Sequence, residues 1–288
     1  MRKHFSNSLT EINLLLYELW YEYLVPGRHA KGVNSDLLFM FWYDGLSIFD
    51  HSSSMTLMNY GYYSSEQIVL EKLDEQDRYR LQLYHHVVSA VTLTSKNVLE
   101  IGSGRGGGAS YVMRYLKPKT LRGIDYSHKS VEFCRKHFSI PGLSFVRGNS
   151  KELKYLDHMF DVVFNIESSH SYQDMESFLS EVFRVLRPGG YFLFADFRVK
   201  DKVALLRQQL LSSGLVILKE ENITLNVIMS LKKDNPRKLA LIDQYVPWFA
   251  RPFFKQFAGT KGSFIYRAFL SGDLEYWNFV LQKPVLSN

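Results

Sequence analysis

The sequence predicts an α/β protein built on a doubly wound, mostly parallel sheet of seven strands, with a helical lid rich in aromatic residues. Between residues 97 and 222, short apolar runs alternate with helical stretches, which is typical of parallel strands joined by crossover helices. The runs around Val163 and Phe192 are apolar throughout, as expected for strands covered on both faces. Aromatic side chains gather outside this region, in residues 36–63 and 224–258, and we expect these two stretches to form the lid.

The first ninety residues are expected to be largely helical. Residues 10–24 are predicted to form an amphipathic helix rather than a signal peptide, because acidic residues interrupt their apolar run. Ser64 and Gln67 have the spacing of a capping box, which predicts the start of a long helix that ends near Ala90. Its apolar residues recur with the period of a helix rather than that of a strand.

The elements of the core follow in chain order. Strands are expected at residues 97–101, 120–125, 143–147, 160–166, 190–197, 215–222 and 274–283. Helices are expected at residues 109–116, 128–138, 174–186 and 201–213, and a helical insertion at 224–258. Ligands of open α/β sheets bind at the carboxyl ends of the strands, so the lid is expected above that edge.

Composition limits the classes of function. With 288 residues, 46% of them hydrophobic, the chain can bury a full core, and no apolar run reaches the roughly 18 residues that cross a bilayer. The single cysteine, Cys134, excludes an internal disulfide and fits a reducing, cytoplasmic location. Lys and Arg outnumber Asp and Glu by 35 to 29 without forming a nucleic-acid motif, so no nucleic-acid partner is predicted. Contact with an anionic membrane stays open.

The segment after the first strand carries most of the chemical information. An apolar run ends on Glu100, and Gly102, Gly104 and Gly106 then lead into a helix. Glycine allows positive φ and close approach of a ligand, and a helix N-terminus offers free N–H groups. The glycines also satisfy the dinucleotide pattern, so NAD and a purely structural turn are alternatives. An acid two residues before the first glycine favours a cofactor with a cationic amino group, which NAD lacks.

Two further strand ends carry polar side chains suited to a nucleoside. Asp125 ends the second strand, where a carboxylate can accept hydrogen bonds from both ribose hydroxyls, although capping of the next helix is the alternative. Tyr126 can flank an adenine. Asn149 and Ser150 follow the third strand, and the Asn149 amide can both donate to and accept from an adenine edge.

These motifs resemble those of class I S-adenosyl-L-methionine (SAM) methyltransferases over residues 97 to about 222. The shared elements are Glu100-x-Gly102-x-Gly104-x-Gly106, Asp125, Gly148-Asn149-Ser150 and Leu186-Arg187-Pro188-Gly189-Gly190. A narrower resemblance is to the phthiotriol dimycocerosate and polyketide-tailoring O-methyltransferases. It rests on Met58–Tyr62, Glu167–Tyr172, Ala195–Arg198 and Phe257–Ser263, with Tyr266 and Tyr276. Asn149 departs from the family's usual Gly-Asp-Ala.

The resemblance implies a Rossmann-like sheet whose last strand is antiparallel, with SAM as cofactor and S-adenosyl-L-homocysteine as product. It divides the chain into an N-terminal cap and lid (1–95), a SAM-binding core (96–223), a helical lid insertion (224–259) and a return to the core (260–288). The expected cofactor-binding residues are Glu100, Gly102, Ser103, Gly104, Gly106, Asp125, Tyr126, Asn149, Ser150 and Glu167.

Methyl transfer to a hydroxyl requires a base at the end of the fourth strand. His170 follows that strand, and imidazole is the side chain that exchanges a proton most readily near neutral pH. It also aligns with the histidine of the family's Glu-Ala-Ser-His segment. Glu167 is expected to hold the cofactor or to orient His170. Asp196, at the end of the fifth strand, is the second catalytic candidate, which orients the base, binds substrate or pairs with Arg198.

The predicted activity is O-methylation of a hydrophobic polyketide, natural product or lipid. Candidate acceptor contacts in the lid are Trp42, His51, Tyr60, Trp248 and Phe249. The alternatives are a SAM-binding cyclase or pericyclase, an N- or C-methyltransferase, and a subunit that docks a partner. No metal site is predicted, because the adjacent His85 and His86 diverge by about 100° on a helix.

Overall fold

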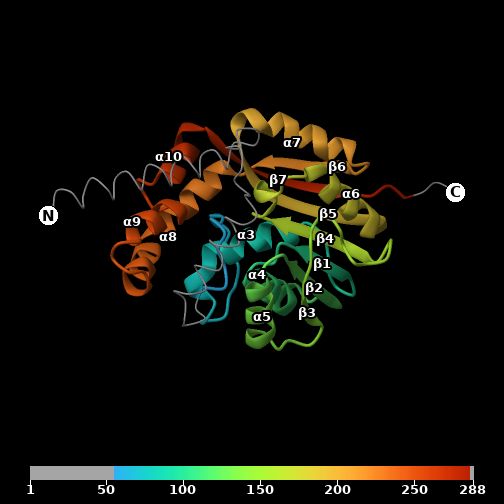
Figure 1. Cartoon of the computed structure of the whole chain (residues 1–288), viewed down its shortest axis with the longest axis horizontal. Coiled ribbons are helices and arrows are strands. Elements are labelled where there is room, and N and C mark those ends of the chain that lie inside the picture. The colour runs from blue at the N-terminus through green and yellow to red at the C-terminus, as the bar shows by residue number, and fades with distance from the viewer. Residues whose placement is uncertain (1–54, 286–288) are drawn as a thin grey trace.

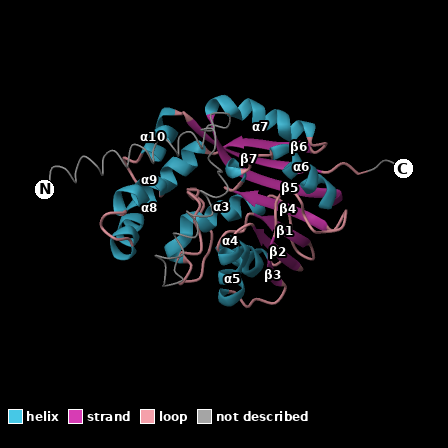
Figure 2. Ribbon diagram, viewed as in Figure 1, coloured by secondary structure: helices cyan, strands magenta, loops and turns pink. Residues whose placement is uncertain are grey.

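The computed structural model describes residues 55–285, and Figure 1 shows their arrangement. The predicted helix at residues 10–24 and the candidate acceptor contacts Trp42 and His51 lie outside the described residues. A seven-stranded sheet crosses the molecule, and α8 (Thr224–Tyr245), α9 (Arg251–Phe257) and α10 (Phe264–Ser271) lie to its left in Figures 1 and 2.

The sheet has the order β3-β2-β1-β4-β5-β7-β6. Strands β1 to β5 pair in parallel, whereas β7 is antiparallel to both neighbours, β5 and β6. The predicted fold class, with its antiparallel last strand, is therefore confirmed. The strands are β1 (Asn97–Ile101), β2 (Thr120–Asp125), β3 (Leu143–Arg147), β4 (Phe160–Ile166), β5 (Leu186–Val199), β6 (Val216–Asn222) and β7 (Leu274–Gln282).

Helices cover both faces of the sheet, because the strands are apolar on both sides. In β5, Leu193, Ala195 and Phe197 face one hydrophobic cluster, and Phe192 and Phe194 face the other. The first cluster includes side chains of α3 (Arg78–Val88), α4 (Gly107–Tyr111), α5 (His128–His137), α8 (Thr224–Tyr245) and α10 (Phe264–Ser271). The second includes side chains of α6 (Met175–Val185) and α7 (Lys200–Ser212).

The predicted helix from Ser64 to Ala90 is wrong in its first half. The helix α3 begins at Arg78, after the short turn η1 (Glu75–Asp77), and residues 66–70 are not helical. The Ser64 hydroxyl accepts a hydrogen bond from the backbone of Glu66 rather than from Gln67. Ile68 and Leu70 pack against the core while Val69, between them, is exposed, so the apolar residues follow the period of an extended segment.

The C-terminal insertion contains a break that was not predicted. The expected helical stretch 224–258 consists of α8 and α9 (Arg251–Phe257), separated by residues 246–250. Val246 is extended, with φ of −99° and ψ of 128°, because the following Pro247 disfavours a helical conformation at the preceding residue. The helix α10 was missed, although the Ser263 hydroxyl caps its start by accepting from the N–H of Tyr266 at 3.1 Å.

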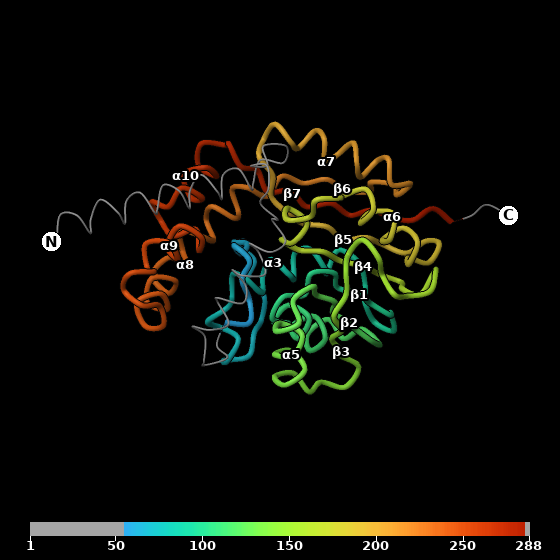
Figure 3. The backbone as a smooth tube through the Cα atoms, in the orientation of Figure 1, coloured from blue at the N-terminus to red at the C-terminus, as the bar shows by residue number. Residues whose placement is uncertain are grey.

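The remaining boundaries agree closely with the predicted ones. The helix after the glycine loop begins at Gly107, two residues early, and continues as a π-helical turn, η2 (Val112–Leu116). Strand β5 is longer than predicted, because Leu186 pairs with Phe160 before a register shift and Val199 pairs with Leu274. The smooth trace in Figure 3 follows these connections. Within residues 55–285, no helix is both long and apolar enough to cross a membrane.

The contact between α4 and α3 yields a prediction about stability. A Cβ on Gly108 would lie 1.9 Å from Cζ of the buried Tyr84, so Gly108→Ala is expected to lower the free energy of unfolding by about 1–3 kcal/mol, despite the better helix propensity of alanine. Urea unfolding measures the change. The matched control is Gly148→Ala, where the nearest atoms of Ile124 are 3.6 Å away and no loss is expected. Equal stability of both variants would contradict this packing.

Candidate active site

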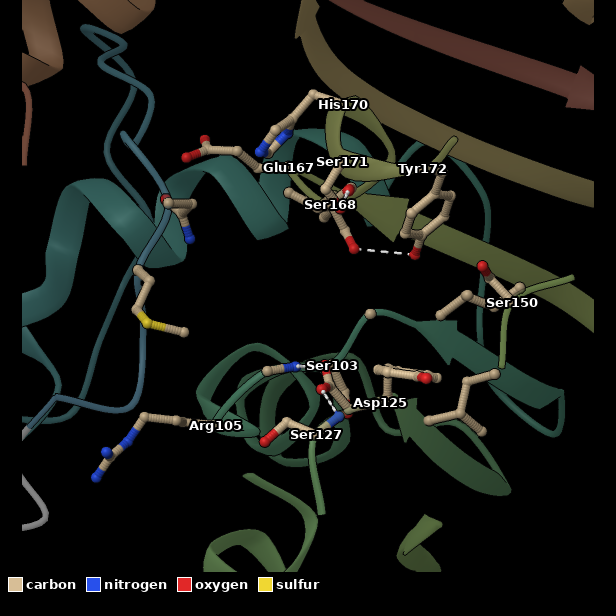
Figure 4. A pocket seen from close by; sticks show the side chains of 18 of the residues that line it. Ser103, Arg105, Asp125, Ser127, Ser150, Glu167, Ser168, His170, Ser171 and Tyr172 are labelled. Carbon is tan, nitrogen blue, oxygen red and sulfur yellow. Dashed lines mark hydrogen bonds between the residues drawn. The ribbon is translucent and has the colours of Figure 1, made fainter. Parts of the chain in front are cut away.

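A cavity of about 360 Å³ opens at the carboxyl ends of β1 to β5. Its walls come from the ends of these strands and the segments that leave them, from residues 56–60, from Tyr84 on α3 and from Phe257 at the end of α9. Figure 4 shows Ser103 and Asp125 on one side, with Ser168 and Tyr172 facing them on the other. The volume suits a small molecule, and the site lies at the predicted edge of the sheet.

The loop after β1 brings bare backbone to the cavity. Gly102 and Gly104 have φ of 77° and 51°, which glycine adopts without steric strain. A Cβ on Gly102 would lie 2.1 Å from Oγ of Ser168, so a side chain at this position would clash with the opposite wall, which approaches the loop closely here. Ser103 also lines the cavity. The loop therefore contributes backbone, without bulky side chains at Gly102 and Gly104, to the cavity wall.

Asp125 fixes the shape of this loop. Its Oδ2 accepts the N–H of Gly104 at 2.8 Å, and its Oδ1 accepts the N–H of Ser127 at 2.9 Å. Helix α5 is capped by Ser127, whose Oγ accepts from Ser130, so the alternative that Asp125 provides this cap is wrong. Burial raises the pKa of Asp125 above its usual value, against these two hydrogen bonds. Both oxygens keep acceptor capacity toward the cavity they line.

Two of the predicted cofactor residues do not line the cavity. A Cβ on Gly106 would meet Cys134 and Phe145 at 2.8 Å, so this glycine permits tight packing of the helix start. Glu100 is 1% exposed and lies behind the loop, where its Oε1 accepts the hydroxyl of Tyr84 at 2.9 Å. Its Oε2 is buried without a hydrogen-bond partner in the described part of the chain. Burial raises the pKa of Glu100 to about 8.

Glu167 lies at the turn after β4, with an unusual positive φ of 50° that marks a strained position. Its Oε2 accepts the backbone N–H of Tyr60 at 2.9 Å and the hydroxyl of Tyr276 at 3.1 Å. Burial raises the pKa of Glu167 to about 8 despite these bonds. Tyr60 and Glu167 both line the cavity, so Glu167 ties the segment before α3 to the end of β4.

His170 and Asp196 are brought together at the cavity wall. Nδ1 of His170 lies 2.9 Å from Oδ1 of Asp196, and the backbone N–H of His170 donates to Oδ2 at 2.8 Å. The imidazole stacks on Phe197, with ring centroids 4.4 Å apart. Because Nδ1 faces a carboxylate, the neutral imidazole is protonated at Nδ1, and Nε2 is the nitrogen that can accept a proton.

The charge of the fully buried Asp196 is balanced by its neighbours. Arg198 approaches Oδ2 at 3.2 Å, and the hydroxyl of Ser169 donates to the same oxygen at 2.7 Å. Burial alone would raise the pKa of Asp196, but His170, Arg198 and Ser169 hold it well below its usual range. Asp196 thus contacts both Arg198 and His170, as two of the roles weighed from the sequence would require.

The other predicted residues divide into those at the cavity and those away from it. Tyr126, Asn149 and Ser150 line it, as expected. Trp248 and Phe249 do not line it and are 70% and 56% exposed, so the expected contact of these two side chains with the cavity is not seen. They lie in the break between α8 and α9, which was not predicted.

Some residues of the cavity wall were missed. Tyr84 reaches it from α3, and no local signal in that helix marks the position. Tyr172 lies in the Glu167–Tyr172 segment, and its hydroxyl lies 2.9 Å from Oγ of Ser168 and accepts from Asn165 at 3.2 Å. In the described part of the chain, no group of three or more His, Cys, Asp or Glu side chains could hold a metal ion.

Comparison with known proteins identifies the family. A family model described as a methyltransferase domain matches residues 99–194. The phthiotriol/phenolphthiotriol dimycocerosates methyltransferase of Mycobacterium tuberculosis is 35% identical over 245 residues, which cover 84% of this chain and 91% of that protein. The chain belongs to this family of class I SAM-dependent methyltransferases.

Two further similarities concern this methyltransferase. A fatty-acid O-methyltransferase of Mycolicibacterium smegmatis is 35% identical over 232 residues, which cover 80% of this chain and 84% of that protein. The crystal structure of the cyclase SpnF superposes with a TM-score of 0.65 at 19% identity, covering 86% of this chain and 95% of that chain. At this identity the likeness concerns the fold alone.

The cofactor of the methyltransferase is SAM, and the cavity has the features that SAM requires. Gly102 and Gly104 present backbone without side chains at the cavity wall, where a ligand can contact it. Asp125 presents a carboxylate at the strand end, where ribose hydroxyls can donate to it. The unpartnered Oε2 of Glu100 adds a buried acceptor behind the loop. These residues fit the cofactor.

The raised pKa of Glu100 predicts a pH dependence of stability. Its carboxyl deprotonates near pH 4.5 when unfolded and near pH 8 when folded, so the unfolded chain binds fewer protons in this interval and stability falls as the pH rises. The free energy of unfolding of the wild type is therefore expected to fall by about 2–4 kcal/mol, relative to that of Glu100→Gln, as the pH rises from 5 to 8. Urea unfolding at both pH values measures this.

The matched control is Glu132→Gln on α5, whose carboxylate is half exposed and for which the same pH interval should bring little change. A stability difference between Glu100→Gln and wild type that stays constant from pH 5 to 8 would contradict the buried, protonated state of Glu100.

Proposed function

We propose that this methyltransferase methylates a hydroxyl group of a hydrophobic small molecule, such as a polyketide, another natural product or a lipid, with His170 as general base. The observation that carries the proposal is the 2.9 Å contact of Nδ1 of His170 with the buried Asp196, at the wall of the cavity. A histidine oriented in this way resembles the base of a catalytic pair, in which a carboxylate fixes the tautomer.

The cofactor is proposed to lie along the ends of β1, β2 and β3. The backbone of Gly102 and Gly104 would contact its methionine part, Asp125 its ribose, and Tyr126 and Asn149 its adenine. When bound, SAM supplies an electrophilic methyl group and leaves as S-adenosyl-L-homocysteine. Glu100, behind the loop, would add negative charge for the amino group once it loses its proton. Glu167 would serve chiefly to hold Tyr60 and Tyr276, which donate to its Oε2.

The base acts on the acceptor. Nε2 of His170 removes the hydroxyl proton as the oxygen attacks, and the permanent charge of Asp196 stabilises the imidazolium that forms. Arg198 and Ser169 keep Asp196 ionised, so the proton that His170 takes up stays on the imidazole and does not pass to Asp196. Stacking on Phe197 limits rotation of the imidazole, which keeps Nε2 aimed at one region of the cavity.

The acceptor end of the cavity is apolar. Phe197 stacks on His170, Tyr60 lies against Phe197 with ring centroids 5.6 Å apart, and the Tyr60 hydroxyl donates to the carbonyl of Phe257; all four residues line the cavity. Two relatives are named a phthiotriol/phenolphthiotriol dimycocerosates methyltransferase and a fatty-acid O-methyltransferase, and these names support a lipid-like acceptor. The single buried cysteine supports the proposed cytoplasmic location, since free thiols persist in reducing compartments.

A carboxylate is the second candidate acceptor, because one relative is named a fatty-acid O-methyltransferase. A carboxylate is already ionised at neutral pH and gains little from a base, whereas an alcohol needs one. The paired His170 and Asp196 therefore favour a hydroxyl. The cyclase named as an alternative from the sequence differs from both, because no methyl group would reach its product.

Transfer of label from methyl-labelled SAM tests the proposal. With a panel of long-chain alcohols, phenols and fatty acids, we expect label in a hydroxyl-bearing product and a loss of at least about 100-fold in kcat for His170→Ala, the lower end for a positioned base. SAM binding, measured by calorimetry, should be retained, because the residues proposed to hold the cofactor are intact.

The matched control is His128→Ala, an exposed histidine on α5 that does not line the cavity and should leave turnover unchanged. Labelled fatty acid with undiminished turnover in His170→Ala would replace the hydroxyl by a carboxylate acceptor. Turnover of SAM-bound enzyme without label in any product would favour the cyclase.

A further inference from the structure

Two aromatic side chains project into solvent at the corner between α8 and α9, residues 246–250. Trp248 is 70% exposed and Phe249 is 56% exposed, and their rings form an edge-on pair with centroids 6.0 Å apart. The corner is held in place from within, because Val246 is buried and Arg251 donates to its carbonyl at 2.9 Å. The aromatic corner therefore has a defined conformation and exposes two large apolar side chains to solvent.

The segment that contains this corner, residues 224–271, is rich in positive charge. Residues 224–271 contain eight of the 35 Lys and Arg residues but only two of the 29 Asp and Glu residues. This sixth of the sequence thus has a net charge of +6, equal to that of the whole chain, and the other five sixths are neutral overall. Four of these cations are exposed, at Lys232, Lys233, Lys261 and Arg267.

A cluster of packed apolar side chains lies between the aromatic corner and the cavity. Phe253, Phe254 and Phe257 follow along α9, and Phe257 lines the cavity about 10 Å from the start of the helix. Met58 lines the cavity as well and packs in the same hydrophobic cluster as these rings.

We infer that the aromatic corner inserts into an anionic lipid bilayer, with the exposed cations Lys232, Lys233, Lys261 and Arg267 held near the headgroups. Indole and phenyl rings lie favourably at the boundary between headgroups and acyl chains, and cations near an anionic leaflet add an attraction that either feature alone would not supply. The end of α9 that lines the cavity would then lie close to the membrane, from which the enzyme would take its apolar acceptor. This inference extends the proposed function but is tested without acceptor or turnover.

Flotation of the full chain with vesicles is the experiment. We expect partition onto vesicles of phosphatidylcholine mixed with phosphatidylglycerol to exceed that onto pure phosphatidylcholine by at least about tenfold, since each cation at the surface contributes about fivefold, and to weaken as salt is added. The double variant Trp248→Ser/Phe249→Ser should lower partition onto the anionic vesicles by at least about tenfold, through loss of aromatic burial.

Two further variants separate the two contributions. Lys261→Gln/Arg267→Gln, near and on α10, should lower binding to the anionic vesicles only. The matched control is Leu156→Ser, which removes an apolar side chain that is 80% exposed in the connection between β3 and β4. It should leave vesicle binding unchanged. Retained SAM binding shows that each variant is folded, since none of these side chains lines the cavity.

Three results would overturn the inference. The first is equal vesicle binding by wild type and Trp248→Ser/Phe249→Ser. The second is binding that does not depend on phosphatidylglycerol, or no binding at all. The third is a wild-type dimer, seen by sedimentation, that becomes a monomer in the double variant, which would mean that a second copy of the chain covers the corner. Failure of the His170 assignment would leave the vesicle result untouched.

Discussion

The geometry of the proposed catalytic centre depends on the hydrogen bonds and the ion pair that the buried carboxylate of Asp196 makes. A fully buried charge is costly unless it is paired and hydrogen-bonded, and Asp196 meets both conditions through Arg198, Ser169 and His170. Those partners come from β5 and from the short turn after β4, so the pairing of these two strands sets their positions. The central sheet thereby determines which nitrogen of His170 carries the proton.

The cavity has two sides with different chemistry, and the order of strands explains the division. On the side of β1, β2 and β3, bare glycine backbone and the carboxylate of Asp125 suit a polar cofactor. On the side of β5 and α9, Phe197 and Phe257 suit an apolar acceptor. Strand β4 lies between them in the sheet, and the segment that leaves it carries His170. The proposed base thus lies where the two substrates would meet.

Local sequence patterns predicted the core because each pattern there has a single physical cause. Apolar runs such as Val162–Phe164 must be covered on both faces, and glycines at positive φ must form the loop after β1. Prediction failed where the apolar residues fit both a helical and an extended period. Ile68 and Leu70 were assigned to a helix, but Val69 between them is exposed and the segment is not helical. The missed helix α10 had both signals in the sequence, Ser263 before it and Gly272 after it.

The site was predictable where it follows strand ends and not where it depends on packing between distant segments. Asp125, His170 and Asp196 were found from their positions after apolar runs. The roles of Tyr84 and Tyr276, which donate to two buried carboxyls, depend on contacts across 16 and 109 residues that no local pattern records. Trp248 and Phe249 were assigned to the acceptor pocket because they are aromatic, whereas a proline-induced break turns them outward.

Nitrogen NMR of the chain with labelled histidine, assigned with the His170→Gln variant, tests the central claim most directly. The hydrogen bond to Asp196 predicts that neutral His170 carries its proton on Nδ1, leaving Nε2 unprotonated, and that the Asp196→Asn variant loses this preference. A neutral His170 protonated at Nε2 in the wild-type protein would contradict the account, because the nitrogen assigned to accept the hydroxyl proton would already hold one.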